Sequence, residues 1–264
     1  MREATTVEAL GAAHAWRERL QRALLDDRFV LHFQPIVSLA SGEVTCHEAL
    51  IRLDDEPNGT LVWPGRFLPF AERSGLILEI DRVVLEKVLA LLAARAVRGP
   101  DGSPTEVTVN LSALSVSDPS LPGRLERRLE LHGVDPSLLI LELTETAAIS
   151  DMGAAGRFCA RALELGCGVA LDDFGAGYGS FTYLKQLPFS HLKIDGQFIR
   201  RLPLSRTDQL IVQALARVVR GMGRETVAEF VSDERTLELL RGYGVDYAQG
   251  FELGTPRPML AFAR

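Results

Sequence analysis

Short apolar segments alternate with longer helical segments over most of this chain. The apolar segments have the length and flanking turn residues of buried strands, and the helical segments place apolar residues at helical spacing. The strand candidates are residues 106–111, 138–143, 169–172, 191–195, 226–231 and 247–251, and the helical candidates lie near 120–132, 152–165, 207–221 and 233–242. Repeated strand-helix units predict a parallel barrel or a doubly wound sheet.

The first quarter of the chain has a different pattern. Residues 7–25 predict a lead-in helix, and residues 29–37 and 44–53 predict two strands joined by a turn at Ser41-Gly42. Because this connection is short, we expect the two strands to form an antiparallel hairpin. A short helix near 64–73 then precedes a helix from residue 76, whose interspersed charges are typical of an amphipathic helix and not of a membrane span.

The sequence lacks the phosphate-binding motifs of two common nucleotide folds. It contains neither a GxGxxG motif opening a first helix nor a P-loop, which weakens the Rossmann and nucleoside-triphosphatase interpretations. One barrel-like α/β domain over residues 27–264, preceded by the helix within residues 1–26, is the economical prediction.

Composition narrows the set of partners. The net charge of -6 argues against a nucleic-acid polymer or an anionic membrane surface as the main partner. A polyanionic ligand would therefore need a local cationic pocket or metal ions. The cysteines Cys46, Cys159 and Cys167 are odd in number and lack zinc-type spacing, so we predict core thiols in a reducing cytoplasm.

Two adjacent carboxylates, Asp172 and Asp173, follow a short buried strand and precede the glycine-rich residues 175–179. Burying like charges side by side costs on the order of several kcal/mol unless cations or strong donors offset it. A pair of divalent metal ions is a natural compensation. The alternative interpretation is a solvated turn that begins at the Asp pair.

Further polar residues occupy inward positions near the ends of other strands. Because side chains alternate along a strand, each of these residues points away from the apolar positions that face the helices. They are Asn110, Glu142, Lys193 and Asp195, and in the hairpin Glu48 shares a side with Arg52. Each alone also fits a strand-end side chain wetted by solvent, but barrel enzymes collect their chemistry at the carboxyl ends of strands.

The acidic and amide residues of this set are all oxygen donors, which suits Mg²⁺ or Mn²⁺ better than zinc. They are Glu48, Asn110, Glu142, Asp172 and Asp173. Two ions about 3.5 to 4 Å apart would activate water and stabilise in-line displacement at a phosphodiester. Lys193 would orient that water or neutralise charge on the phosphoryl oxygens. Its alternative role is a structural ion pair with a neighbouring carboxylate.

Taken in order, these motifs resemble the EAL domain family of cyclic-di-GMP-specific phosphodiesterases. The resemblance covers roughly residues 20–260. The matching motifs are Phe33-Gln34-Pro35-Ile36, Glu48-Ala49-Leu50 with Arg52, Asn110-Leu111-Ser112, Glu142-Leu143-Thr144-Glu145-Thr146, Asp172-Asp173-Phe174-Gly175-Ala176-Gly177, Leu192-Lys193-Ile194-Asp195, Val227-Ala228-Glu229, and Gln249-Gly250-Phe251 with Pro256.

The resemblance implies a TIM-like (β/α)8 barrel with an antiparallel first strand, and two Mg²⁺ or Mn²⁺ ions that support hydrolysis of cyclic di-GMP to linear pGpG. The implied ligands are Glu48, Asn110, Glu142 and Asp172 for the first ion, and Asp172, Asp173 and Glu229 for the second. The implied catalytic residues are Glu229 as a general base, Lys193 holding the attacking water, Gln249 supporting the site, and Glu145 steadying the loop after Asp173. The implied substrate contacts are Gln34, Leu50, Arg52 at a phosphate, Asp195 and Phe251.

Two segments depart from the family pattern. After Glu229 the family often has Gly-Val-Glu, whereas this chain has Phe230-Val231-Ser232. The loop at residues 176–181 also differs from the common Thr-Gly-Tyr-Ser-Ser-Leu. We expect these differences to affect the rate and the coupling of the loop more than metal binding. In relatives that loop helps form a dimer, so a homodimer is an expectation from the family.

Three functions remain open at this point. The leading one is an active phosphodiesterase, because no implied metal ligand is missing. The second is a receptor domain that binds cyclic di-GMP without turnover, and the third is a barrel metalloenzyme acting on another phosphodiester. Family members often carry a sensory or GGDEF domain ahead of a helix like residues 7–25, so we expect the chain to be part of a longer cytoplasmic protein without a membrane segment in this part.

Overall fold

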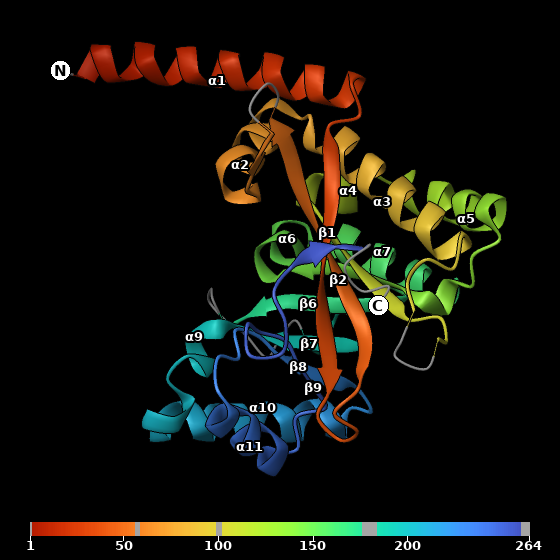
Figure 1. Cartoon of the computed structure of the whole chain (residues 1–264), viewed down its shortest axis with the longest axis vertical. Helices are drawn as coiled ribbons and strands as arrows, with labels where there is room; N and C mark the ends of the chain where they lie inside the picture. Colours follow the sequence, from red (N-terminus) through yellow and green to blue (C-terminus); the bar gives the residue numbers. More distant parts are fainter. Residues whose placement is uncertain (1, 56–58, 99–101, 176–183, 260–264) are drawn as a thin grey trace.

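Eight strands close into a barrel in the computed structural model, which describes residues 2–55, 59–98, 102–175 and 184–259. The barrel strands are β1 (Phe29–Ser38), β2 (Val44–Asp55), β4 (Glu106–Leu111), β5 (Leu139–Thr144), β6 (Gly168–Phe174), β7 (His191–Ile194), β8 (Glu225–Ala228) and β9 (Tyr247–Ala248). Two short strands, β3 (Thr60–Val62) and β10 (Arg257–Pro258), pair with β2 and β1 (Figure 1). The predicted barrel is confirmed, and the doubly wound sheet is wrong.

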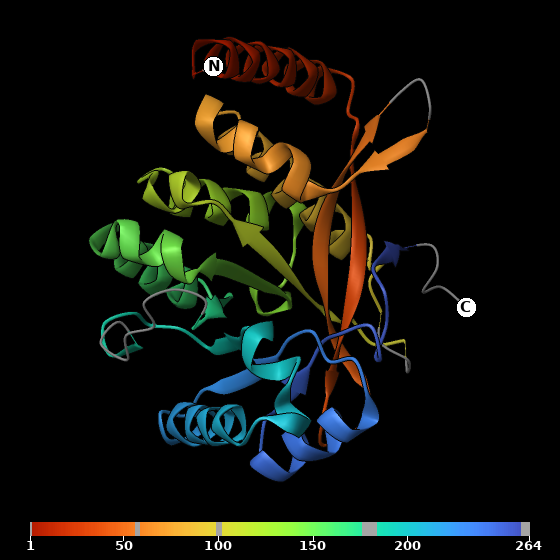
Figure 2. The ribbon, with the colours of Figure 1, turned by 90° about the vertical axis from the view of Figure 1, so that its left-hand side faces the viewer.

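The first strand runs against the others, as expected. β1 is antiparallel to both of its barrel neighbours, β2 and β9, whereas the remaining neighbouring barrel strands are parallel. The predicted hairpin is confirmed, and Figure 2 shows β1 and β2 side by side along much of the molecule. Its register sets Gln34 opposite Glu48. The hairpin therefore places Gln34 and Glu48 next to each other in the barrel.

Helices cover the outside of the barrel. They are α1 (Arg2–Leu25), α2 (Pro64–Ser74), α3 (Ile77–Ala93), α4 (Ala113–Ser117), α5 (Leu121–His132), α6 (Glu145–Ser150), α7 (Met152–Glu164), α9 (Gly196–Ile199), α10 (Arg206–Gly221) and α11 (Glu234–Tyr243). The apolar alternate residues of the strands, such as Val107, Val109 and Leu141, are buried in the layer between strands and helices. Burial of this layer is the main stabilising term, and it fixes which side chains face inward.

The barrel interior has an apolar layer. It consists of Ile36, Cys46, Ile140, Ala170 and Val227, one from each of five strands. Each of these residues lies two positions before or after a polar site residue on the same strand or, for Val227, directly after it, so the next layer toward the site is polar. All three cysteines are buried free thiols, as predicted.

The carboxyl-terminal part of α1 packs against the barrel domain. Trp16 stacks on Phe70 of α2 at 5.4 Å between ring centroids, and Leu20 and Ala23 are buried in the main core. Figure 1 shows α1 lying beside α2 at one end of the molecule. The division of the chain at residues 26 and 27 stays a prediction. No helix among the described residues has the length and apolar content needed to span a membrane.

Three predicted strands end earlier than expected. The strand predicted at 226–231 ends at Ala228, and Phe230 has a φ of 54° that turns the backbone out of the sheet. The strand predicted at 247–251 likewise ends at Ala248. The third ends at Ile194, because Asp195 caps α9 by accepting a hydrogen bond from the Gln197 backbone N–H. These early ends release the following residues into loops beside the site.

Candidate active site

Every barrel strand, or the residue directly after it, supplies at least one polar residue to the site. Because the strands close a ring, residues far apart in the sequence meet at one end of the barrel. The eight residues are Gln34 in β1, Glu48 in β2, Asn110 in β4, Glu142 in β5, Asp172 in β6, Lys193 in β7, Glu229 directly after β8, and Gln249 directly after β9. The inward positions predicted for Asn110, Glu142 and Lys193 are confirmed by their contacts with one another and with Glu48.

Lys193 lies at the centre of the carboxylates. Its Nζ is 2.8 Å from Glu142 Oε2, 2.9 Å from Glu229 Oε1, 3.2 Å from Asp172 Oδ1 and 3.6 Å from Glu48 Oε2. The side chains of this group are buried. Lys193 therefore forms the ion pairs that the alternative interpretation expects, and both its structural role and its role with an attacking water stay predictions.

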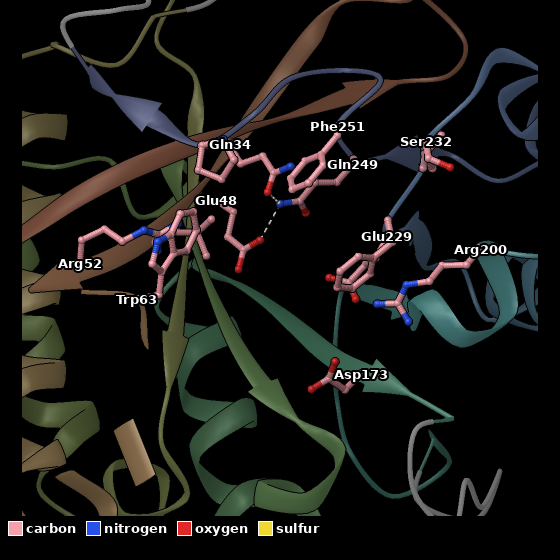
Figure 3. Close-up of a pocket in the computed structure, with 15 residues that line it drawn as sticks. Gln34, Glu48, Arg52, Trp63, Asp173, Arg200, Glu229, Ser232, Gln249 and Phe251 are labelled. Atoms are coloured by element: carbon pink, nitrogen blue, oxygen red, sulfur yellow. Dashed lines mark hydrogen bonds between the residues drawn. The ribbon is translucent and has the colours of Figure 1, made fainter. Parts of the chain in front are cut away.

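Glu48 is held by two amide side chains. Its Oε1 accepts a hydrogen bond from Asn110 Nδ2 at 2.8 Å, and its Oε2 accepts one from Gln249 Nε2 at 2.6 Å. The same Gln249 nitrogen donates to Gln34 Oε1 at 3.1 Å, while Gln34 Nε2 donates to the Gly254 carbonyl at 3.0 Å. Figure 3 shows Gln34, Glu48 and Gln249 meeting at the upper side of the cavity. This chain of hydrogen bonds fixes the orientation of the Glu48 carboxylate.

Asp173 joins the site because the backbone of β6 is irregular. Consecutive residues of a regular strand point to opposite sides. Asp173 instead has a left-handed φ of 55°, and the pairing of β6 with β7 shifts between Leu171 and Phe174. The Asp173 N–H donates to Asp172 Oδ1 at 2.8 Å. Single carboxylate oxygens of Asp172, Asp173 and Glu229 all lie within 4.8 Å of one another. The alternative of a simple solvated turn at the Asp pair is wrong.

Burial and charge shift the pKa values in the site in opposite directions. Burial lowers the pKa of Lys193, but the surrounding carboxylates, Asp172 first, outweigh it and hold this pKa well above its usual value. Burial raises the pKa of Glu142 well above its usual value and that of Glu229 to about 8. Burial, and then repulsion by Asp172, raise the pKa of Asp173. The protein alone thus supplies too little positive charge for its carboxylates.

The donor set fits divalent cations that prefer oxygen. Four carboxylates surround the Lys193 ammonium, and Asp173 adds a fifth beside Asp172 and Glu229, which leaves an excess of negative charge. Asn110 adds an amide oxygen beside Glu48. The buried Oε1 of Glu142 has no hydrogen-bond partner among the described residues. Carboxylate and amide oxygens are the preferred ligands of Mg²⁺ and Mn²⁺, and an added cation would offset the repulsion. The predicted ions therefore fit these residues, while the choice of ion and the ligand assignments stay predictions.

A cavity of about 590 Å³ opens beside the carboxylates. Four of the five predicted substrate contacts line it: Gln34, Leu50, Arg52 and Phe251. Asp195 does not line this cavity, and its Oδ1 caps α9. Its charge nevertheless contributes to the raised pKa of Asp173. All five substrate contacts stay predictions.

Glu145 is buried at the start of α6. Its Oε2 accepts a hydrogen bond from the Gly175 N–H at 3.0 Å, directly after the Asp pair and Phe174. The loop that this residue is expected to steady continues through residues 176–181, which lie outside the described residues. The contact with Gly175 is consistent with the predicted role.

Three aromatic or arginine residues of the cavity had no assigned role in the sequence. Trp63, Arg200 and Phe230 all line the cavity. The Arg52 guanidinium lies over the Trp63 ring at 4.1 Å, and the Arg200 guanidinium lies over the Phe230 ring at 4.0 Å. Only Phe230 left a signal in the sequence, as an aromatic residue directly after Glu229. Its left-handed φ of 54° is unfavourable for a bulky residue, by about 1 to 2 kcal/mol.

The fold and the site together define an α/β-barrel protein with a carboxylate-lysine centre at one end of the barrel. A family model described as the EAL domain matches residues 17–256. The chain belongs to the EAL domain family. This finding confirms the resemblance read from the ordered motifs.

Relatives and solved structures agree with this assignment. The cyclic di-GMP phosphodiesterase PdeB of Shewanella oneidensis is 33% identical over 95% of this chain and 29% of PdeB. The bifunctional diguanylate cyclase/cyclic di-GMP phosphodiesterase MucR of Pseudomonas aeruginosa is 39% identical over 97% of this chain and 36% of MucR. The structure of the PaMucR phosphodiesterase in complex with c-di-GMP has a TM-score of 0.85 at 37% identity, covering 94% of this chain and 99% of that one.

The chain spans only about a third of the length of these two curated relatives. The predicted homodimer, the cytoplasmic location, and the sensory or GGDEF domain of a longer protein stay predictions.

Proposed function

We propose that this chain is a metal-dependent phosphodiesterase that hydrolyses cyclic di-GMP to linear pGpG. One observation carries the proposal: an oxygen-donor set suited to divalent cations and a buried lysine meet directly beside a cavity lined by arginine and aromatic side chains. The names of the relatives PdeB and MucR support the choice of substrate.

The proposed metal ligands divide into two groups. Glu48, Asn110, Glu142 and Asp172 would hold one ion, and Asp172, Asp173 and Glu229 would surround the other. When bound, two such ions would lower the pKa of water and stabilise charge on the phosphoryl oxygens. The short separation of the Asp172, Asp173 and Glu229 oxygens supports the second group.

The remaining roles fall to the protein's own groups. Glu229 would accept the proton of the attacking water, which Lys193 would hold in line with the scissile bond. Arg52 would bind a phosphate of the ligand, and Gln249 would keep Glu48 oriented. The water oxygen forms a new bond to phosphorus while one ring P–O ester bond breaks. The product is a linear dinucleotide with one phosphomonoester.

A chromatographic assay tests the proposal. The purified chain is incubated with cyclic di-GMP and Mg²⁺ or Mn²⁺, beside a chelator control, and pGpG is expected only with metal. Glu48→Ala should reduce turnover by at least about 100-fold, because a metal ligand and its hydrogen bonds are lost. The matched control is Glu225→Gln, which alters a carboxylate at the other end of β8 and should leave turnover unchanged.

Other outcomes would assign other functions. Tight binding of cyclic di-GMP without metal-dependent hydrolysis would favour the receptor. Preferential hydrolysis of a different cyclic dinucleotide would favour the third function. An unaffected rate in Glu48→Ala would contradict the metal assignment.

A further inference from the structure

Phe230 is an exposed aromatic residue held in an unfavourable backbone conformation beside the site. It directly follows Glu229, lines the cavity, and remains 51% exposed. Its φ of 54° lies in the left-handed region that favours glycine. Strained residues of this kind cluster at active sites and ligand clamps. Packing in the core therefore does not account for Phe230.

The position of the ring is fixed from one side. The Arg200 guanidinium covers one face at 4.0 Å from the ring centroid. The ring also lies against Gly196 at the start of α9, where an added Cβ would be only 2.4 Å from Phe230 Cδ2. Because Phe230 lines the cavity and remains half exposed beside these groups, part of the ring is open to the cavity. A flat apolar face is thus presented to whatever occupies the cavity.

A second pair of the same kind lies across the cavity. Arg52 stacks over Trp63 on one side, and Figure 3 shows Arg200 on the opposite side, with Glu48 and Glu229 between them. A ligand that spans the cavity therefore meets an arginine-aromatic pair on each side. A cyclic dinucleotide has two bases on opposite sides of its phosphate ring, which matches the presence of one aromatic ring on each side of the cavity.

We propose that one guanine of the substrate stacks on the cavity face of Phe230, and that Arg200 is a positioning residue that holds the ring from behind. This subsite rests on the proposed function. Aromatic side chains bind bases by stacking, and a guanidinium on the far face adds a cation-π contact. Phe230 thus contributes to substrate affinity and takes no part in bond cleavage.

Steady-state kinetics with cyclic di-GMP and Mn²⁺ test the subsite. Phe230→Gly should raise KM roughly 5- to 150-fold, the range expected for loss of one base-aromatic stack, with kcat within about threefold of the wild type. Phe230→Tyr keeps the aromatic face and should retain a nearly wild-type KM. Arg200→Lys should give an intermediate KM, because it keeps the charge but loses the planar stack.

A matched variant separates stacking from backbone strain. Arg95 also has a left-handed φ, of 51°, but lies outside the cavity. Phe230→Gly and Arg95→Gly should both melt at or above the wild-type temperature, because glycine adopts this φ without strain. Only the Phe230 variant should change KM.

The outcomes distinguish the subsite from the function on which it rests. If the wild type hydrolyses cyclic di-GMP and Phe230→Gly has an unchanged KM, the subsite is wrong and the proposed function stands. If the wild type binds cyclic di-GMP without turnover, the Kd is measured instead by calorimetry with Mn²⁺ present. Phe230→Gly should then raise Kd by the same factor that is expected for KM, and an unchanged Kd would contradict the subsite. A wild type that neither binds nor hydrolyses the dinucleotide overturns both.

Discussion

Lys193 Nζ lies 2.8 Å from Glu142 Oε2 inside the barrel, and both side chains are almost completely shielded from solvent. Three further carboxylates surround the same ammonium. A single buried cation therefore faces several buried anions. We therefore expect the stability of the barrel to depend on divalent cations, which links the structure of the site to its proposed chemistry.

Replacing Lys193 should destabilise the protein, because the excess of buried negative charge then increases. In the absence of divalent cations, Lys193→Met should lower the free energy of unfolding by about 3 to 5 kcal/mol, because buried carboxylates lose their partner. Added Mn²⁺ should restore part of that loss. Urea denaturation with and without Mn²⁺ measures both effects. The matched control is Lys87→Met, whose ion-pair partner Asp27 is 76% exposed, so this pair should contribute at most about 1 kcal/mol. Equal effects of the two variants would contradict the prediction.

The amide of Gln249 should tune metal affinity. Gln249→Ala removes the hydrogen bond to Glu48, so the carboxylate is no longer held in one orientation. Loss of such an outer partner typically weakens metal binding by about 10- to 100-fold. The Mn²⁺ concentration that gives half-maximal activity is the measurement. Gln209→Ala, which removes a hydrogen bond to the Leu202 carbonyl outside the site, should leave this concentration unchanged.

Arg52 should act through both its charge and its planar shape. Its guanidinium stacks over Trp63 and donates to the Ile51 carbonyl at 2.8 Å. Arg52→Ala should raise KM roughly 10- to 150-fold, the range of a lost charged hydrogen bond, and Arg52→Lys should recover only part of it. Arg224→Lys changes an arginine near Phe189 that does not line the cavity, and it is expected to keep the wild-type KM. A wild-type KM in Arg52→Lys would show that the positive charge alone is enough and that the planar guanidinium is not needed.

Gly250 should be required by close backbone contact. A Cβ at this position would lie 2.0 Å from the Val231 carbonyl oxygen, so Gly250→Ala must shift one of the two loops beside the site. Overpacking of this kind typically destabilises by about 1 to 3 kcal/mol. Thermal melting measures the loss. At Gly221, where an added Cβ meets nothing within 4 Å, the change to alanine should not lower the melting temperature. A wild-type melting temperature for Gly250→Ala would argue against the tight contact.

Alternation along the strands made much of the site predictable. Apolar residues such as Val107 and Val109 must face the helices, so Asn110 had to point the other way. The same reasoning placed Glu142 and Lys193 inside the barrel. The predicted strand ends were less accurate, because the positive φ at Phe230 depends on loop contacts that apolar periodicity does not encode.

Other members of the site could not be derived from the pattern. Strict alternation would turn Asp172 and Asp173 to opposite sides, and only the left-handed backbone at Asp173 brings both to one place. Trp63 and Arg200 lie in segments without a chemical motif. Their contribution depends on the packing of distant elements around one cavity.

The sequence by itself determined the order of strands and helices, the antiparallel hairpin, and the family, because these depend on local periodicity and on ordered motifs. Only the tertiary structure decided that the sheet closes into a barrel, that Lys193 lies among four carboxylates, and that two arginine-aromatic pairs face one cavity. The physical reason is that closure brings together groups far apart in the chain, and their charges and contacts exist only once the barrel has formed.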